Sequence, residues 1–314
     1  MIGYDRRFAG ADDYTYVRCL GCGVVALDPL PTSDQIARSY PPAYYAGLDG
    51  PGRNLDRRIN RLAVRYYYGV DSPNRSALLR RLFAALSGRV LAGLLSPWGE
   101  HRLLDVGCGT GAALATYQRL GWQVAGIERS PDATALARAR GLRVHLGEVF
   151  DAPFGPEFDI VLLSHVIEHV RDPVAVLARA ATFVAPGGKI VILTPNLRSL
   201  GFWLYGSCWF ALEAPRHLFL FDPSALAELG RKADLVPVRL ITRGDATVLR
   251  YSRYYARTQG AVLPNGAAAR TAIVRDVVAH PPVHRRITDL LTPLSWIAAR
   301  FGRGETIVAE LRPT

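Results

Sequence analysis

A short apolar strand that runs directly into a glycine-rich turn is the feature that most constrains this chain. Residues 103–111 read Leu-Leu-Asp-Val-Gly-Cys-Gly-Thr-Gly, with glycine at every second position from 107 to 111. Because glycine has no Cβ, such a turn lets the backbone bend sharply and approach a nucleotide-like ligand closely. We therefore predict a nucleotide-binding α/β unit whose ligand lies at the end of this strand.

Asp105 indicates which nucleotide ligand fits. Gly107, Gly109 and Ala112 satisfy the G-x-G-x-x-G/A pattern that binds the pyrophosphate of a dinucleotide. A carboxylate two residues before the first glycine would repel that anion, and the turn contains no lysine to compensate. S-adenosylmethionine carries a sulfonium and an ammonium group, which an acidic side chain attracts. The sequence therefore favours this cofactor, with an NAD-dependent oxidoreductase as the alternative.

Acidic residues recur where a nucleoside would need them. The hydrophobic pattern predicts a helix at 112–120 and strands at 122–127 and 142–146. Glu128 follows the first of these strands, where a carboxylate can accept both ribose hydroxyls. Glu148 and Val149 follow the second strand, at the place expected for adenine.

The remaining pattern continues the alternation of strands and helices. Strands are expected at 158–163, 188–193, 236–241 and 306–311, and helices at 172–183 and 223–231. Such alternation predicts a parallel sheet covered on both faces. The expected fold class is α/β: a Rossmann-like sheet of seven mostly parallel strands with helices on both faces, an N-terminal helical segment, and a helical insertion before the last strand.

Several motifs in this order resemble class I S-adenosylmethionine-dependent methyltransferases. They are Asp-x-Gly-x-Gly-x-Gly at 105–111, Glu128, Ser-His-Val-Ile-Glu-His-Val-Arg-Asp-Pro at 164–173 and Pro-Gly-Gly-Lys at 186–189. Glu168-His169, Thr194-Pro195-Asn196 and Pro215-Arg216-His217-Leu218 are similar to the ubiquinone-biosynthesis O-methyltransferase-like branch. The resemblance covers 99–242. It implies that the last strand is antiparallel and lies beside the fifth, which leaves 243–304 as a long insertion.

The resemblance also implies which residues bind S-adenosylmethionine. Glu128 would hold the ribose, Glu148 and Val149 the adenine, and Ser164 would lie near the reacting face. The methionine half would be held by Asp105, Gly107, Cys108, Gly109 and Gly111.

Three histidines are the candidates for a catalytic base. The sulfonium methyl is already activated, so the protein has to align the acceptor, exclude water and, where needed, remove a proton. His165 and His169 follow the fourth strand, and His217 follows an aromatic segment at 200–212; each is equally a structural residue on pattern alone. His165-x-x-Glu168-His169 also matches the H-x-x-E-H zinc-protease pattern, but it lies inside a nucleotide-binding unit, so a zinc-protease site is not predicted and no metal ligand is assigned. The resemblance to ubiquinone O-methyltransferases, some of which use a divalent metal at a Glu-x-x-Glu-His cluster, leaves such a metal open, although His165 replaces the first glutamate here.

Positive charge is concentrated outside the expected cofactor-binding core. The formal net charge is +11, and 51–98 and 244–303 each contain nine arginines against two and three aspartates. A basic rim favours an anionic acceptor, such as a sugar- or lipid-linked one, or peripheral contact with an acidic membrane; a solvated basic face is the alternative. No nucleic-acid-binding motif is present, which disfavours nucleic acid as a partner.

Three regions are expected along the chain. Cys19-Leu-Gly-Cys22 resembles the second half of a zinc ribbon found ahead of some methyltransferases, without its first half, so 1–50 is interpreted as a zinc-ribbon-like remnant. A basic helical lid at 51–98 and the methyltransferase domain at 99–314 follow. No signal peptide or membrane-spanning run is visible, which predicts a cytoplasmic protein, with peripheral membrane contact left open. The expected function is methylation, at oxygen, of a small or amphiphilic acceptor, with a noncatalytic cofactor-binding scaffold as the alternative.

Overall fold

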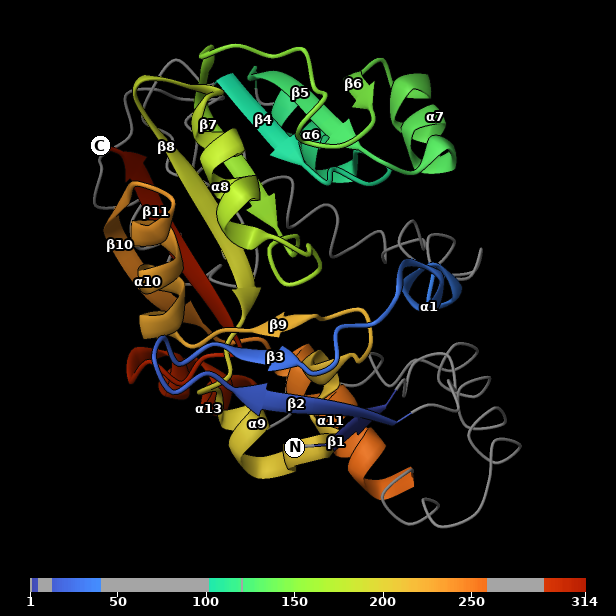
Figure 1. Ribbon diagram of the computed structural model, residues 1–314, viewed down its shortest axis with the longest axis vertical. Coiled ribbons are helices and arrows are strands. Elements are labelled where there is room, and N and C mark those ends of the chain that lie inside the picture. Colours follow the sequence, from blue (N-terminus) through green and yellow to red (C-terminus); the bar gives the residue numbers. More distant parts are fainter. Residues whose placement is uncertain (1, 5–12, 41–101, 120, 259–290) are drawn as a thin grey trace.

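A seven-stranded sheet forms the centre of the protein (Figure 1). The structure, a computed structural model, describes residues 2–4, 13–40, 102–119, 121–258 and 291–314. The strand order is β10-β11-β8-β7-β4-β5-β6. The strands are β4 (Arg102–Val106), β5 (Gln123–Glu128), β6 (Arg143–Leu146), β7 (Phe158–Ser164), β8 (Val184–Pro195), β10 (Leu235–Arg243) and β11 (Thr306–Pro313). The basic lid predicted at 51–98 lies outside the described residues.

The direction of the strands confirms the predicted topology. β8, β7, β4, β5 and β6 run parallel to one another. β11 lies between β8 and β10 and is antiparallel to both. The carboxyl ends of the parallel strands therefore meet at one edge, where open α/β sheets bind their ligands.

Helices cover both faces of this sheet, as predicted. Leu114 of α6 (Ala112–Arg119) and Ala137 of α7 (Pro131–Ala139) are buried on one face. α8 (Pro173–Ala181) and α10 (Pro223–Lys232) bury their apolar side chains on the other. α7, α8 and α10 each begin with proline after a Ser or Asp N-cap, because that side chain accepts a hydrogen bond from the first turn and proline needs no backbone donor there.

A second, antiparallel sheet joins the N-terminal segment to the rest of the chain. It has the order β1-β2-β3-β9, with β1 (Ile2–Tyr4), β2 (Asp13–Arg18), β3 (Val25–Leu27) and β9 (Phe219–Leu220). The helix α1 (Ser33–Arg38) follows β3. Cys19 and Cys22 lie between β2 and β3, and among the described residues no third potential ligand forms a metal-binding group with them. The zinc-ribbon interpretation and the predicted domain boundaries stay predictions.

Short helices fill the carboxyl side of the large sheet. α9 (Leu200–Tyr205) and the 3-10 turns η1 (Gly206–Cys208) and η2 (Phe210–Leu212) follow β8. Within the predicted insertion at 243–304, the structure describes α11 (Ala246–Thr258) and α13 (Leu291–Arg300). None of the described helices is long and apolar enough to cross a membrane.

Glu305 fastens α9 to the start of β11. Its Oε1 accepts a hydrogen bond from the backbone N–H of Gly201 (2.8 Å), and its Oε2 accepts one from the indole of Trp209 (3.1 Å). The side chain is buried, and burial raises the pKa of Glu305 from 4.5 to about 7. The folded protein therefore binds a proton at this position more tightly than the unfolded chain does.

Glu305 should make the fold less stable as the pH rises. A raised carboxyl pKa contributes stability that is fully present below pH 4.5 and is lost as the pH approaches 7. The slope is at most about 1.4 kcal/mol per pH unit. In denaturant unfolding across this window, we expect wild-type protein to lose stability relative to Glu305→Gln as the pH rises.

Glu310, on β11, provides the matched control for this measurement. Burial opposes its ionisation, but hydrogen bonds and charges from Lys189 and Arg239 outweigh burial and lower the pKa of Glu310. Its contribution is therefore constant above its usual pKa and lost only at lower pH. A pH slope for Glu305→Gln that matches the slope for Glu310→Gln would contradict the role assigned to Glu305.

Candidate active site

Asp105 is a buried carboxylate that lacks one hydrogen-bonding partner. It lies at the end of β4, is 4% exposed, and its Oδ1 has no hydrogen bond within the described part of the chain. Burial, and then the charge of Glu128, raise the pKa of Asp105 to about 7. A buried acceptor left in this state is costly, so the site is suited to a cation or hydrogen-bond donor brought by a ligand.

The glycine-rich turn is tied to the end of β5. The backbone N–H groups of Gly107 and Cys108 donate to the carbonyl of Ile127, at 2.8 and 3.1 Å. The Glu128 carboxylate accepts from the N–H of Gly109 through Oε2 and from the N–H of Ser130 through Oε1, both at 2.8 Å. Each carboxylate oxygen has a further lone pair, so Glu128 can hold the turn and still accept from ribose hydroxyls.

Gly111 should tolerate no side chain. Its φ is +75°, and a Cβ there would lie 2.4 Å from Cδ1 of Leu142 and 3.1 Å from Cβ of Ala137. We expect Gly111→Ala to lower the free energy of unfolding by about 2 kcal/mol or more, from strain and overpacking together. Gly121 also has a positive φ, but a Cβ there would meet no atom within 4 Å. Gly121→Ala therefore measures the cost of backbone strain alone. Equal losses in thermal unfolding would contradict the packing argument.

Three other predicted cofactor residues differ in how they present their side chains. Glu148 is exposed, and its backbone N–H donates to Oδ1 of Asp151 (2.8 Å). Val149 is buried in the core, and its carbonyl accepts from Arg179 (3.3 Å). The Cys108 side chain packs in the core beside Leu114. Because this side chain is buried, only the backbone of Cys108 is predicted to contact the cofactor.

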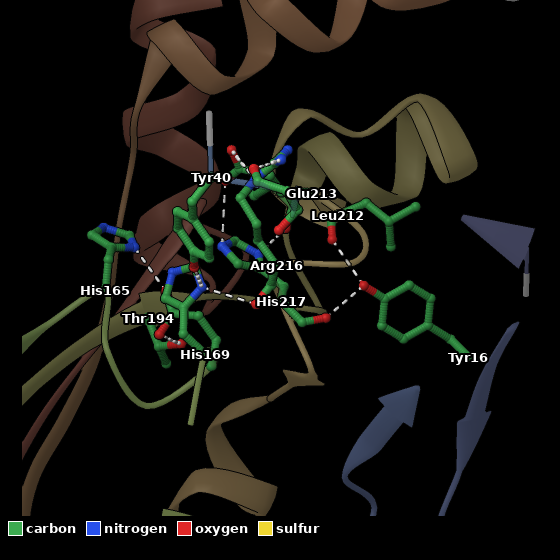
Figure 2. Close-up of polar contacts among 12 residues, drawn as sticks. Tyr16, Tyr40, His165, His169, Thr194, Leu212, Glu213, Arg216 and His217 are labelled. Atoms are coloured by element: carbon green, nitrogen blue, oxygen red, sulfur yellow. Dashed lines mark hydrogen bonds and ion pairs between the residues drawn. The ribbon is translucent and has the colours of Figure 1, made fainter. Parts of the chain in front are cut away.

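His165 and Glu168 form a hydrogen-bonded pair at the end of β7. His165 directly follows Ser164, the last residue of β7, and its Nδ1 lies 3.0 Å from Oε1 of Glu168 (Figure 2). Thr194 of β8 donates to the other oxygen, Oε2, at 3.0 Å. Glu168 is fully buried; burial opposes its charge, but hydrogen bonding to His165 and three nearby imidazoles lower the pKa of Glu168 to about 2.

The electrostatics of His165 suit a base. Desolvation lowers its pKa, but the hydrogen bond and the charge of Glu168 outweigh that effect, so the pKa of His165 is raised above 6.5. The imidazole is 49% exposed. The backbone has φ 55°, an uncommon conformation for a residue other than glycine, and such strain clusters at functional sites. With Nδ1 donating to Glu168, Nε2 is free to accept a proton.

The rings of His169 and His217 pack edge to face, close to Glu168. Their ring centroids are 4.6 Å apart. Nδ1 of His169 donates to the carbonyl of Arg216 (2.9 Å), and Nδ1 of His217 donates to the carbonyl of Ala211 (2.8 Å), as carbonyls only accept. Burial, and then the charge of His217, lower the pKa of His169 to about 4. His169 is therefore neutral near pH 7, and both rings turn Nε2 away from these carbonyls.

The structure groups three potential metal ligands in this cluster, where the sequence left a divalent metal open without assigning its ligands. One ligand atom from each of Glu168, His169 and His217 falls within 4.8 Å of the others. Two imidazoles, each with a backbone carbonyl at Nδ1, and one carboxylate are donors that suit a divalent ion. Both Glu168 oxygens, however, already accept hydrogen bonds from His165 and Thr194.

The N-terminal segment contributes polar contacts that sequence reasoning missed. The Tyr40 hydroxyl lies 3.1 Å from Nδ1 of His169, and the buried Arg216 donates to the carbonyl of Ser39 (2.9 Å). Tyr16 of β2 reaches the carbonyls of Leu212 and His217 with its hydroxyl, as Figure 2 shows. These contacts join residues more than a hundred positions apart, so no local sequence signal could have found them. The structure therefore brings the three predicted histidines together and adds Tyr40 beside them.

The fold and the site define a class of protein: class I S-adenosylmethionine-binding α/β proteins. Residues 57–240 match the family described as "Methyltransferase domain". The match covers more than half of the chain, so the chain belongs to this methyltransferase family.

Curated relatives point to the same family. A ubiquinone biosynthesis O-methyltransferase from Cereibacter sphaeroides is 33% identical over 180 residues, which is 53% of this chain and 72% of that protein. One from Xanthomonas oryzae is 35% identical over 148 residues, or 43% of this chain; the match spans only 62% of that protein's length. Among solved structures, a methyltransferase from Thermotoga maritima, titled a possible histamine N-methyltransferase, is 20% identical with a TM-score of 0.47 and covers 82% of this chain and 99% of its own.

Proposed function

We propose that this chain transfers the methyl group of S-adenosylmethionine to an oxygen atom of a small or amphiphilic acceptor. The observation that carries the proposal is Asp105: a buried carboxylate beside a glycine turn, with one oxygen that no described residue hydrogen-bonds. A pyrophosphate would add a second anion to this place, whereas the ammonium of the methionine half supplies both charge and donors. Glu128 would accept from the ribose, and 147–149 would contact the adenine.

The acceptor would lie beside His165. When bound, S-adenosylmethionine supplies a methyl group that is already activated for transfer. Nε2 of His165 would take the proton of the acceptor hydroxyl as the hydroxyl oxygen bonds to the methyl carbon; the bond from that carbon to the sulfonium sulfur would break, and S-adenosylhomocysteine would leave. Glu168 holds the opposite nitrogen and stabilises the imidazolium that results. An O-methylation proposal fits this pair because a neutral hydroxyl needs a base, while the likeness to O-methyltransferases supports the same choice.

His169 and His217 are positioning residues in this proposal. Their Nδ1 atoms are fixed on backbone carbonyls, and their rings are more buried than that of His165. They support the segment 213–217 and, through Tyr40, the N-terminal segment. Ser164, half-buried at the end of β7, lies between the cofactor turn and His165 along the chain.

Transfer of a labelled methyl group tests the proposal. Purified protein is incubated with methyl-labelled S-adenosylmethionine and three acceptor sets: phenols, sugar phosphates and lipid-linked sugars. We expect a labelled, alkali-stable ether in one set, together with an equal amount of S-adenosylhomocysteine. Label on nitrogen or carbon would contradict O-methylation. Cofactor binding without transfer to any set would favour the noncatalytic scaffold.

A further inference from the structure

Several large apolar side chains are exposed to solvent at one end of the molecule. Trp203 and Leu204 of α9 are 70% and 45% exposed. Trp296 and Ile297 of α13 are 47% and 57% exposed, and Phe301, just after α13, is 79% exposed. Single exposed apolar residues need no explanation, but two tryptophans and a phenylalanine at one end of a protein mark an interaction surface.

These residues belong to elements that are held together. The backbone N–H of Leu200, at the start of α9, donates to the carbonyl of Arg303, in the turn after α13 (2.9 Å). α9 and α13 also both pack against α11. Figure 1 shows α9 and α13 at the same end of the molecule, beyond the carboxyl end of β8. We call the exposed surface formed by α9, α13 and the turn 301–303 the aromatic end.

Three exposed arginines lie at the aromatic end. Arg198, Arg300 and Arg303 are exposed, and none forms an ion pair with a carboxylate of the described residues. The nearby Glu305 is buried and binds Gly201 and Trp209 instead. Three unpaired arginines among exposed aromatic rings are complementary to a surface that is both apolar and anionic.

We propose that the aromatic end docks on a lipid bilayer with anionic headgroups. Tryptophan and phenylalanine partition into the headgroup region, and each arginine close to an anionic bilayer strengthens binding. A symmetric dimer through this surface would instead bring the arginines of two copies toward each other. α9 and α13 are 6 and 10 residues long, too short to span a bilayer, so the contact is peripheral.

Docking here would place the candidate active site close to the bilayer. The segment 196–199 joins β8 to α9, and Thr194, at the end of β8, hydrogen-bonds to Glu168 of the His165 pair. An amphiphilic acceptor could then keep its apolar part in the bilayer while its polar head reaches His165. This consequence rests on the proposed function, whereas the docking itself does not.

Co-sedimentation with vesicles tests the docking. Wild-type protein is mixed with vesicles of phosphatidylcholine alone or with phosphatidylglycerol added. We expect binding to the anionic vesicles only, weakened by salt. Trp296→Ser with Phe301→Ser should lower the partition coefficient about tenfold or more, and so should Arg300→Ser with Arg303→Ser. Leu136→Ser, at an equally exposed apolar residue of α7 (49%), is the matched control and should bind as wild type does.

Each outcome bears on the proposal. Failure of wild-type protein to bind anionic vesicles would overturn it, and so would binding of both double variants as strong as that of wild type. A change in self-association of the double variants without vesicle binding would assign the surface to a second copy instead, and would also overturn it. Unchanged titration with S-adenosylmethionine shows that each variant is folded. Vesicle binding without any methyl transfer would contradict the proposed function and leave the docking supported.

Discussion

Replacing Asp105 with asparagine is expected to weaken S-adenosylmethionine binding by about 30-fold to 1,000-fold, or roughly 2 to 4 kcal/mol. The physical reason is that the cofactor's ammonium would lose a carboxylate in a buried, low-dielectric place, where charge pairs are strong. Calorimetric titration at about pH 8, where wild-type Asp105 is ionised, measures the change. Asp159→Asn, in the ion pair with Arg102 at the opposite edge of the sheet, is the control.

The same substitution should make the protein without cofactor more stable. The pKa of Asp105 is raised from 3.8 to about 7, so the ionised side chain destabilises the fold as the pH rises through this range. Asparagine removes the charge, and the unfolding free energy at about pH 8 should rise by about 1 kcal/mol or more. Weaker binding and higher stability together are characteristic of a functional residue. Unchanged affinity would mean that the cofactor lies elsewhere.

Replacing His165 with glutamine is expected to lower kcat by about 100- to 10,000-fold, the usual contribution of a positioned base. S-adenosylmethionine affinity should be unchanged, because the proposed role of His165 concerns the acceptor. In wild-type protein the rate should rise with pH through the pKa of His165, which lies above 6.5, since only neutral imidazole accepts a proton.

Glu168→Gln separates a base from a merely structural histidine. Without the charge of Glu168, the pKa of His165 should fall, and the inflection of the pH–rate profile should move to lower pH. His169→Gln should leave the position of that inflection in place, because the pKa of His169 is about 4. If the inflection moved with His169→Gln and stayed in place with Glu168→Gln, His169 would be the base, and the role proposed for His165 would be contradicted.

The large sheet was predictable because its signals are local. Periodic apolar runs predicted each strand of the Rossmann-like sheet, and the helices predicted at 172–183 and 223–231 begin where Asp172 and Asp222 precede a proline. The helix α7, which begins after Ser130, was not predicted. The ends were less exact: the strand predicted at 188–193 spans Val184–Pro195. Val184 pairs with Phe158 of β7 ahead of an irregularity that contains the glycines at 187 and 188, and Pro195 pairs with Thr306 of β11. Pairing adds hydrogen bonds that hydrophobicity does not encode.

The candidate site was predictable only in part. Asp105 and the glycine turn stand within one short motif, so their proximity follows from the sequence. The contact of His169 with His217 and with Tyr40 depends on how β3 pairs with β9 and on where the 213–217 segment packs. The hydrogen bond from Thr194 to Glu168 joins two neighbouring strands. Such long-range pairings are products of the tertiary fold, and a single sequence carries no separate signal for them.

Side-by-side calorimetric titration with S-adenosylmethionine, S-adenosylhomocysteine and NAD tests the central claim most directly, namely that Asp105 and the glycine turn form a site for S-adenosylmethionine. We predict that the first two bind, that Asp105→Asn weakens both because each carries the ammonium group, and that NAD does not bind. Binding of NAD alone, or equal binding of S-adenosylmethionine by wild-type protein and Asp105→Asn, would contradict the claim.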